Sequence, residues 1–529
     1  MADPQETWAR YLDADTRKSP TSKMLPPERR VPGLTILHHP DLRRVGERAT
    51  LPELGSGRKV LLSRVSPDFT APGEAARRPL ADPYLSRRPW TLCPEGDGGV
   101  RLDGEGSSIT VVAEGSSVDP GRSFSRSDLE QGVVLELSGR LVLLLHLLNA
   151  SPPRVPRFGM VGESGGLLAV RQKVQQLTDL SGAVLIRGET GTGKELVARA
   201  LHRAGARSSG PYRAVNMGAI SKELAAAELF GVARGAFTGA DRKRPGLFRT
   251  CHGGTLFLDE IGETPPEIQV ALLRVLEEGE VRPVGSEETE QVDVRVVAAT
   301  DADLEGMIEE GGFRAPLWHR LSGCEIHLPP LRQRRDDLGR LLVHFLRQEL
   351  EALGRPEVLD LGDPGDEPWL SARVVAWLAS RCWAGNVRQL RNVARQLVAA
   401  CRDESVACIT VDIERLLSEG DSPQAKEVEE SSPRKTYRRS EEVSEEELLS
   451  VLRANRWRFL PTAAQLGISR TALYGLIDRF PNVRKPGDLE FDEIERSHRR
   501  CAGDLEAMVD ELQVSRKGLR RRMTELGMD

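Results

Sequence analysis

The sequence predicts a multidomain protein with an N-terminal β-sandwich, a central α/β domain and a C-terminal all-α region. Short apolar segments separated by Gly, Pro, Asp and Ser fill the first 150 residues, as in strands joined by tight turns. Past a Pro-rich junction at 150–156, helical patterns alternate with apolar strands, which indicates an α/β sheet. Near the C-terminus, residues 462–474 combine a helix, a Gly-containing turn and a second helix.

Length and composition limit the class of protein. A chain of 529 residues is too long for one core, so we expect several domains. The net charge of −5 confines any nucleic-acid-binding surface to part of the molecule. The longest apolar run, Leu141 to Leu148, is too short to span a membrane. The seven cysteines include no C-x-x-C pair, so we expect a reduced, cytoplasmic protein without structural zinc or membrane contact.

Changes in composition indicate the domain boundaries. Residues 1–30 are polar and Pro-rich, and 419–443 are charged without periodicity, as in disordered segments and linkers. We expect a disordered N-terminus over 1–30, the sandwich over 31–150, a linker over 151–158, the α/β domain with a helical lid over 159–402, a second linker over 403–443 and the all-α region over 444–529.

Two segments of the sandwich have the composition of phosphate-binding loops. Arg64 ends one apolar segment, and 82–89 carries Ser86 followed by two arginines. This region resembles a forkhead-associated domain, which binds phosphothreonine peptides. The resemblance implies a phosphate clamp of Arg64, Ser86 and either Arg87 or Arg88. Ser63 and Pro89 depart from the family pattern, so docking by other means stays open beside binding of a threonine-phosphorylated protein or Ser/Thr kinase.

A phosphate-binding loop follows an apolar strand at 183–186 and precedes a helical pattern from Leu196. Its spacing, G-x-x-x-x-G-K, lets successive backbone N–H groups and a helix N-terminus face phosphate oxygens. Lys194 would reach the β- and γ-phosphates of ATP, and Glu195 replaces the usual Ser/Thr ligand of Mg²⁺. The expected nucleotide-binding residues are Gly188, Glu189, Thr190, Gly191, Thr192, Gly193, Lys194 and Glu195.

An apolar strand at 254–260 ends in two carboxylates. Buried parallel strands deliver acids to nucleotide pockets in this way. Asp259 is placed to hold Mg²⁺, directly or through water, and Glu260 is placed to orient the attacking water.

Together these motifs resemble the AAA+ domain of bacterial enhancer-binding proteins, the activators of sigma-54 RNA polymerase. Residues 160–164 resemble the segment that contacts adenine, and Asn216 the residue that holds the catalytic glutamate, here Glu260. The string GAFTGA at 235–240 resembles the loop that engages sigma-54. The implied contact residues are Gly235, Ala236, Phe237, Thr238, Gly239 and Ala240.

The same resemblance assigns three further roles. Thr300 ends a buried strand as the first sensor does, and Arg388 corresponds to the second sensor. Arg314 and Arg320 are both candidates for an arginine that reaches the γ-phosphate of a neighbouring subunit. Such a residue requires an oligomer, and the family implies a hexameric ring.

The helix-turn-helix pattern at 462–474 resembles the Fis-like domain that ends enhancer-binding proteins. Residues 512–519 repeat the pattern of 466–473, so the unit is expected to be duplicated. The resemblance implies binding of upstream DNA, although a helical dimerisation module is the alternative. The expected DNA contacts are Ser469, Arg470, Thr471, Tyr474, Ser515, Arg516 and Lys517.

Together, these resemblances predict an ATP-hydrolysing transcription activator. It would open promoters bound by sigma-54 RNA polymerase and be regulated by its N-terminal domain. Two alternatives stay open: a DNA-binding regulator with a vestigial ATPase, and an AAA+ adaptor that remodels a different protein.

Overall fold

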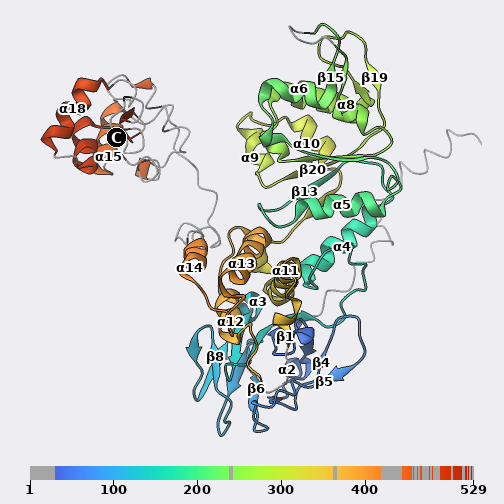
Figure 1. Ribbon diagram of the computed structural model, residues 1–529, viewed down its shortest axis with the longest axis vertical. Coiled ribbons are helices and arrows are strands. Elements are labelled where there is room, and N and C mark those ends of the chain that lie inside the picture. The colour runs from blue at the N-terminus through green and yellow to red at the C-terminus, as the bar shows by residue number, and fades with distance from the viewer. Residues whose placement is uncertain are drawn as a thin grey trace, which may run out of the picture. The chain divides into compact units, whose positions relative to one another are not determined.

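The computed structural model describes residues 30–236, 242–360, 366–418 and, with gaps, 444–526 (Figure 1). The chain divides into two compact units, residues 1–425 and 426–529, which are treated separately below. Within the described part, no helix has the length and apolar character needed to cross a membrane.

Two antiparallel sheets form the N-terminal region (blue in Figure 1). The eight-stranded sheet has the order β5-β4-β2-β1-β12-β11-β8-β9, and the four-stranded sheet has the order β10-β7-β6-β3. Leu34 and Leu143 of the first sheet share one buried core with Leu92 and Leu102 of the second. The strands are β1 Arg30–His38, β2 Arg48–Thr50, β3 Val60–Leu62, β4 Phe69–Thr70, β5 Arg77–Arg78, β6 Trp90–Pro94, β7 Val100–Asp103, β8 Val111–Ala113, β9 Ser116–Ser117, β10 Gly121–Phe124, β11 Val133–Leu137 and β12 Leu141–Asn149, with short helices η1 Leu42–Arg44, α2 Pro52–Gly55 and α3 Arg126–Gln131.

A parallel five-stranded sheet of order β14-β17-β20-β13-β21 forms the centre of the α/β domain. Side chains alternate across this sheet, so Phe257 packs with α4 and α5 whereas Leu256 and Leu258 pack with α8 and α10. Both faces are therefore covered, as parallel sheets require. The elements are α4 Gly165–Leu177, β13 Val184–Arg187, α5 Lys194–Ala204, β14 Tyr212–Asn216, α6 Lys222–Phe230, α7 Leu247–Thr250, β17 Thr255–Asp259, α8 Pro266–Glu278, β20 Arg295–Thr300, α9 Leu304–Glu309, α10 Ala315–Leu321 and β21 Glu325–His327, with two small ladders, β15 Gly231–Val232 with β16 Arg244–Pro245 and β18 Glu280–Val281 with β19 Glu290–Gln291.

In the described residues, the lid contains the helices α11 Leu338–Ala352, α12 Ala372–Ala379, α13 Asn386–Cys401 and α14 Val411–Ser418. Leu342 of α11 and Val375 of α12 belong to the same buried cluster as Leu37 of β1 and Leu144 of β12. The lid and the N-terminal sheets thus share a hydrophobic core, a contact that the sequence patterns did not predict.

The C-terminal unit contains α15 Glu445–Ala454, α18 Phe491–Arg500 and α19 Leu505–Leu512. Leu466 and Leu473, which flank the predicted turn, are buried in the core of this unit. All seven predicted DNA contacts lie outside the described residues, as do Phe237, Thr238, Gly239 and Ala240 of the predicted sigma-54 loop.

Candidate functional site

The phosphate-binding loop joins β13 to α5, as predicted. Gly191 and Gly193 have φ values of +80° and +107°, which residues with a Cβ rarely adopt. Lys194 is the first residue of α5, and its Nζ donates to the carbonyl oxygen of Gly188 over 2.7 Å. The lysine ammonium therefore lies inside the loop, at the N-terminus of an eleven-residue helix, where an anion is stabilised.

The lid contacts this loop directly. A Cβ on Gly191 would lie 2.4 Å from the carbonyl oxygen of Gly385, so only glycine permits this approach. Asn386, the first residue of α13, donates from Nδ2 to the carbonyl oxygen of Thr190 over 3.1 Å. The backbone N–H of Arg388 donates to the carbonyl oxygen of Gly191, so the predicted second sensor lies beside the loop.

Glu189 holds the loop to the segment that precedes the lid. Its carboxylate pairs with the guanidinium of Arg332 over 2.6 and 2.9 Å and accepts from Asn386 over 2.9 Å. The hydrogen bond from Arg332 is the main cause of a lowered pKa for Glu189. Glu189 is therefore held ionised by the lid side of the pocket.

The predicted carboxylates stand at the end of β17, facing the same cavity as the loop. Asp259 ends the strand, and Glu260 follows it in the left-handed region at φ +54°. Burial is the main factor that raises the pKa of Asp259, while the nearby Lys194 acts in the opposite direction. A partly buried carboxylate of this kind is stabilised by a bound cation, which agrees with the oxygen ligands that Mg²⁺ prefers.

Asn216 ends β14 and is paired in register with Asp259. Its Oδ1 accepts from the backbone N–H of Ala219 over 3.1 Å, and in the described residues no hydrogen bond joins it to Glu260. A Cβ on Gly218 would lie 2.5 Å from Glu260 Oε2 and 3.4 Å from Asn216 Oδ1. The two side chains thus face the same glycine without contacting each other through a hydrogen bond.

Glu195 stands where a serine or threonine is usual, and its side chain contacts a residue of its own helix. Its carboxylate pairs with Arg199, one helical turn away, over 2.6 Å. On the other side of the loop, Thr190 donates to Asp301 over 2.5 Å. Thr300 is buried at the end of β20, and its Oγ1 accepts from the backbone N–H of Ala302 over 3.0 Å.

Arg314 directly precedes α10, Arg320 lies in its last turn, and both are exposed. Arg320 donates from its guanidinium to the carbonyl oxygen of Leu276 over 3.0 and 3.1 Å. The backbone N–H of Arg314 donates to Gln269. Neither arginine lines the nucleotide cavity of its own chain.

Two residues at this site were missed by the sequence reasoning. Arg334 is buried and donates to the carbonyl oxygen of Thr192 over 3.1 Å. Asp337 accepts from the backbone of Glu163 and Ser164 over 2.5 and 2.9 Å. The run Arg-Arg-Asp-Asp at 334–337, directly before the lid helix, was the available signal.

The loop, the carboxylates and the lid enclose a cavity of about 680 Å³. Its lining includes Lys194, Asp259 and Glu260 from the α/β domain and Arg388 from the lid. The volume lies in the range of small-molecule sites. In the described residues, no group of three or more metal-ligating side chains is assembled without a ligand.

Comparison with known proteins identifies the central part of the chain. Residues 160–327 match the sigma-54 interaction domain, and residues 332–430 match the AAA+ ATPase lid domain. The transcriptional regulator NtrC of Salmonella typhimurium is 45% identical over 251 residues, which are 47% of this chain and 51% of NtrC. The chain thus spans about half the length of the NtrC proteins that it matches.

The transcriptional regulatory protein ZraR of Escherichia coli O157:H7 is 36% identical over 342 residues, covering 63% of this chain and 72% of ZraR. The chain belongs to the sigma-54 enhancer-binding family of AAA+ transcription activators. A solved structure of NtrX from Brucella abortus in complex with ATP is 32% identical, covers 61% of this chain and 69% of that chain, and has a TM-score of 0.43. The predicted resemblance of the central domain is confirmed, whereas the forkhead-associated and Fis-like resemblances stay predictions.

In this enhancer-binding protein, the predicted phosphopeptide residues come together at one end of the N-terminal sheets. The backbone N–H of Arg64 donates to the carbonyl oxygen of Ser86, and its guanidinium donates to the carbonyl oxygen of Pro83, both over 3.3 Å. The hydroxyl of Ser86 accepts from the backbone N–H of Arg88 over 3.0 Å. Arg87 is exposed beside them.

Proposed function

We propose that this chain is an ATP-dependent transcription activator that remodels sigma-54 RNA polymerase into open promoter complexes. The observation that carries the proposal is the convergence of Lys194, Asp259 and Glu260 on one cavity closed by the lid. ATP hydrolysis needs a cation, a magnesium ligand and a general base. In this proposal Lys194, Asp259 and Glu260, in that order, take these three roles.

The chemistry follows from the positions of these groups. Backbone N–H groups of the loop and Lys194 bind the phosphates of ATP. Asp259 would hold Mg²⁺, which would neutralise negative charge on the phosphates of ATP. Glu260 orients the attacking water and accepts its proton. Thr300 and Arg388 would act as the two sensors that the family implies, so that a change at the γ-phosphate would alter the contact between the α/β domain and the lid.

Arg314 and Arg320 are exposed and do not line the nucleotide cavity of their own subunit. This arrangement would suit residues that complete the nucleotide site of a neighbouring subunit. A guanidinium from the next subunit would stabilise the charge that develops during phosphoryl transfer. The protein would therefore act as a ring, of six subunits as the family implies.

Contact with sigma-54 is assigned to the loop 235–240. Gly235, at the start of this loop, has φ +81°, a backbone conformation that glycine adopts without steric cost. Its Phe237 and Thr238 supply an apolar contact and a hydroxyl for the target.

The C-terminal and N-terminal regions would direct the protein to its promoters and regulate its activity. The C-terminal unit would bind upstream DNA, and the loops around Arg64 and Ser86 would bind a threonine-phosphorylated protein. Arg64 already donates to backbone carbonyl oxygens at this site, and phosphate would offer its guanidinium a stronger acceptor.

The test is retention of sigma-54 by the full chain in the presence of ADP and aluminium fluoride, which mimic the transferring phosphate. Wild type is expected to retain sigma-54 only with this analogue, and Thr238→Ala is expected to retain none while hydrolysing ATP normally. Normal hydrolysis without retention by wild type would favour an adaptor for a different protein. Absence of ATP hydrolysis would favour the vestigial ATPase.

A further inference from the structure

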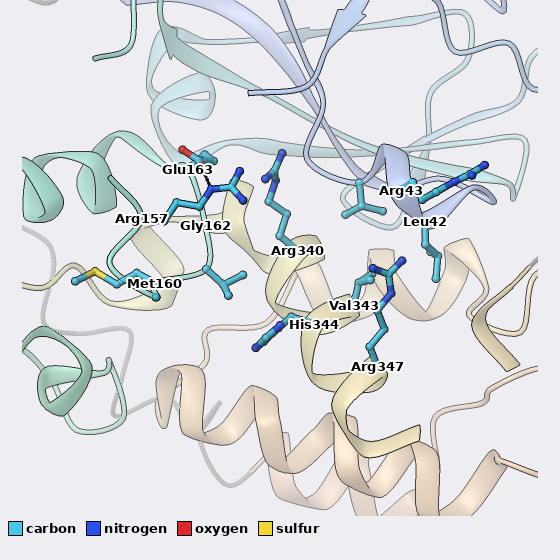
Figure 2. Close-up of a pocket in the computed structure, with 13 residues that line it drawn as sticks. Leu42, Arg43, Arg157, Met160, Gly162, Glu163, Arg340, Val343, His344 and Arg347 are labelled. Carbon is cyan, nitrogen blue, oxygen red and sulfur yellow. Dashed lines mark hydrogen bonds and ion pairs between the residues drawn. The ribbon is translucent and has the colours of Figure 1, made fainter. Parts of the chain in front are cut away.

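A second cavity, of about 390 Å³, is lined by a segment that also contributes residues to the lining of the nucleotide cavity (Figure 2). We call residues 159–164 the rim segment and this cavity the seam site. Three parts of the chain form its walls: Leu42 and Val45 of the N-terminal region, the rim segment, and one face of α11.

The α11 wall carries Arg340, Val343, His344 and Arg347, whose spacing of three and four residues places them on one helical face. Arg340 is fixed in place because its Nη2 donates to the carbonyl oxygen of Gly46 over 3.0 Å. Gly46 has φ +86°, and a Cβ there would lie 1.7 Å from Arg340 Nε. The N-terminal region is thus shaped to admit this guanidinium.

Positive charge exceeds negative charge around the seam site. Arg43, Arg157, Arg340 and Arg347 line it, against the single carboxylate of Glu163. Glu163 already pairs with Arg157 over 3.1 Å and with Arg171 over 3.3 Å, and Arg43 pairs with Asp41 outside the lining. In the part of the chain that the structure describes, neither Arg340 nor Arg347 forms an ion pair. A polyanion would offset this excess.

Each of the three walls also contributes apolar side chains. Leu42, Val45, Met160 and Val343 line the space between the arginines, so one region of the cavity suits a ring or hydrocarbon group. Small-molecule sites commonly combine such a wall with a few charged groups that orient the ligand.

The seam site also shares a wall with the nucleotide cavity. Met160, Val161 and His344 line both. The N-terminal region shares its core with the lid, whereas the rim segment leads into α4 of the α/β domain. A ligand here would therefore contact the lid side and the α/β side together.

We propose that the seam site binds a small molecule carrying a polyphosphate group and couples its binding to the nucleotide cavity. The polyphosphate would lie between Arg340 and Arg347, and any organic group would pack on Leu42 and Met160. The coupling rests on the proposed ATPase function, whereas binding at the seam site does not.

The test uses the full chain with Lys194→Ala, which removes the phosphate-binding cation of the nucleotide cavity. Calorimetric titrations without Mg²⁺ use ATP and, separately, inorganic tripolyphosphate as probes. One equivalent of binding is expected to remain, and Arg347→Glu is expected to weaken it by about tenfold or more. Arg274→Glu reverses an exposed charge on α8, outside the seam site, and is expected to leave the binding unchanged.

Binding of both probes would mean that polyphosphate suffices, and binding of ATP alone would mean that the nucleoside is also required. The proposal would be overturned if neither probe binds, or if Arg347→Glu leaves the binding unaffected. If Lys194→Ala does not fold, the stoichiometry of ATP on the otherwise wild-type chain replaces it, with two equivalents falling to one on Arg347→Glu. If the chain with Lys194 intact hydrolyses ATP but binds only one equivalent of it, the seam site is refuted and the proposed function is not. If ATP binds at the seam site but is not hydrolysed, only the proposed function is refuted.

Discussion

The buried carboxylate of Asp337 accepts hydrogen bonds from both the backbone N–H and the hydroxyl of Ser164, over 2.9 and 2.6 Å. Asp337 directly precedes α11, and Ser164 caps the N-terminus of α4. This pair therefore joins the lid to the α/β domain beside the nucleotide cavity.

Replacing Asp337 with alanine should weaken both folding and nucleotide binding. The change leaves two backbone N–H groups and a hydroxyl buried without their acceptor, a loss of about 2–4 kcal/mol in the free energy of unfolding. Urea denaturation and ATP titration would measure the two effects. Asp337→Asn keeps one oxygen acceptor and should recover part of the ATP affinity. Equal affinity in all three proteins would contradict a role for this pair in shaping the cavity.

Loss of the Lys194 ammonium should reduce ATP affinity. Lys194→Ala is expected to weaken binding at the nucleotide cavity by at least about tenfold, since a charge-assisted contact with phosphate is removed. Lys173→Ala, at an exposed position of α4, serves as the matched control and should bind normally. Equilibrium binding of a fluorescent ATP analogue at high salt would report the difference. An unchanged affinity for Lys194→Ala would remove the phosphate-binding role of this lysine.

Glu260→Gln should separate binding from turnover. The amide occupies the same space as the carboxylate but does not accept a proton, so turnover should fall by about 100-fold or more. ATP affinity should stay close to that of wild type, because Lys194 and the loop are untouched. Steady-state phosphate release and ATP titration would be measured together. A variant that retains turnover would transfer the base role to another group.

Arg320→Ala should bind ATP but fail to hydrolyse it if its guanidinium acts on a neighbouring subunit. Mixing Arg320→Ala with Lys194→Ala should then restore part of the activity, since an intact arginine from one protein can reach an intact loop of the other. Arg314→Ala is tested in parallel, because both arginines are candidates. If mixing restores nothing with either variant, the claim of action between subunits fails.

Acidification should destabilise the N-terminal region through two buried histidines. Burial is the main cause that lowers the pKa of His38 and His146 to about 3, whereas an unfolded histidine titrates near pH 6.5. Between these values the unfolded chain binds protons that the folded chain excludes. The free energy of unfolding should therefore fall with decreasing pH, by up to about 1.4 kcal/mol per pH unit for each histidine.

His38→Leu tests this pH dependence directly. Among the described residues, neither ring nitrogen of His38 has a hydrogen-bond partner, so leucine should be tolerated and the slope of stability against pH should become shallower. Urea denaturation between about pH 4 and pH 7 measures that slope. His319→Gln, at an exposed position of α10, should leave it unchanged. An unaltered slope in His38→Leu would show that His38 has the same pKa in the folded and the unfolded chain.

The parts of the site that are local in sequence could be predicted. The loop 188–194 is recognisable because its strand, glycines and helix are contiguous, and Asp259 and Glu260 because they directly follow one apolar strand. Asn386, Arg334 and Asp337 act on the loop and the rim segment from beyond residue 330. The charged run at 334–337 marks two of these residues, but the partners of all three depend on how the lid folds back, which no local pattern encodes.

The shared core of lid and N-terminal sheets escaped prediction for a related reason. Leu342 and Leu346 of α11 show the spacing of any amphipathic helix, which does not specify the surface that covers them. The turn residues around β1 and β12 predict strands of a separate sandwich, and the apolar residues on both faces of these strands do not specify which element covers the outer face.

The core shared by the lid and the N-terminal sheets affects experiments that remove the N-terminal region. Leu37, Val134, Val142 and Leu144 cover apolar side chains of α11 and α12. A shortened chain that begins at residue 151 would expose those lid residues to water, and an uncovered apolar patch promotes self-association. A change in activity on such truncation could therefore result from self-association through the exposed lid. Point substitutions at Arg64 or Ser86 leave the shared core intact and test the proposed regulatory role of the N-terminal region directly.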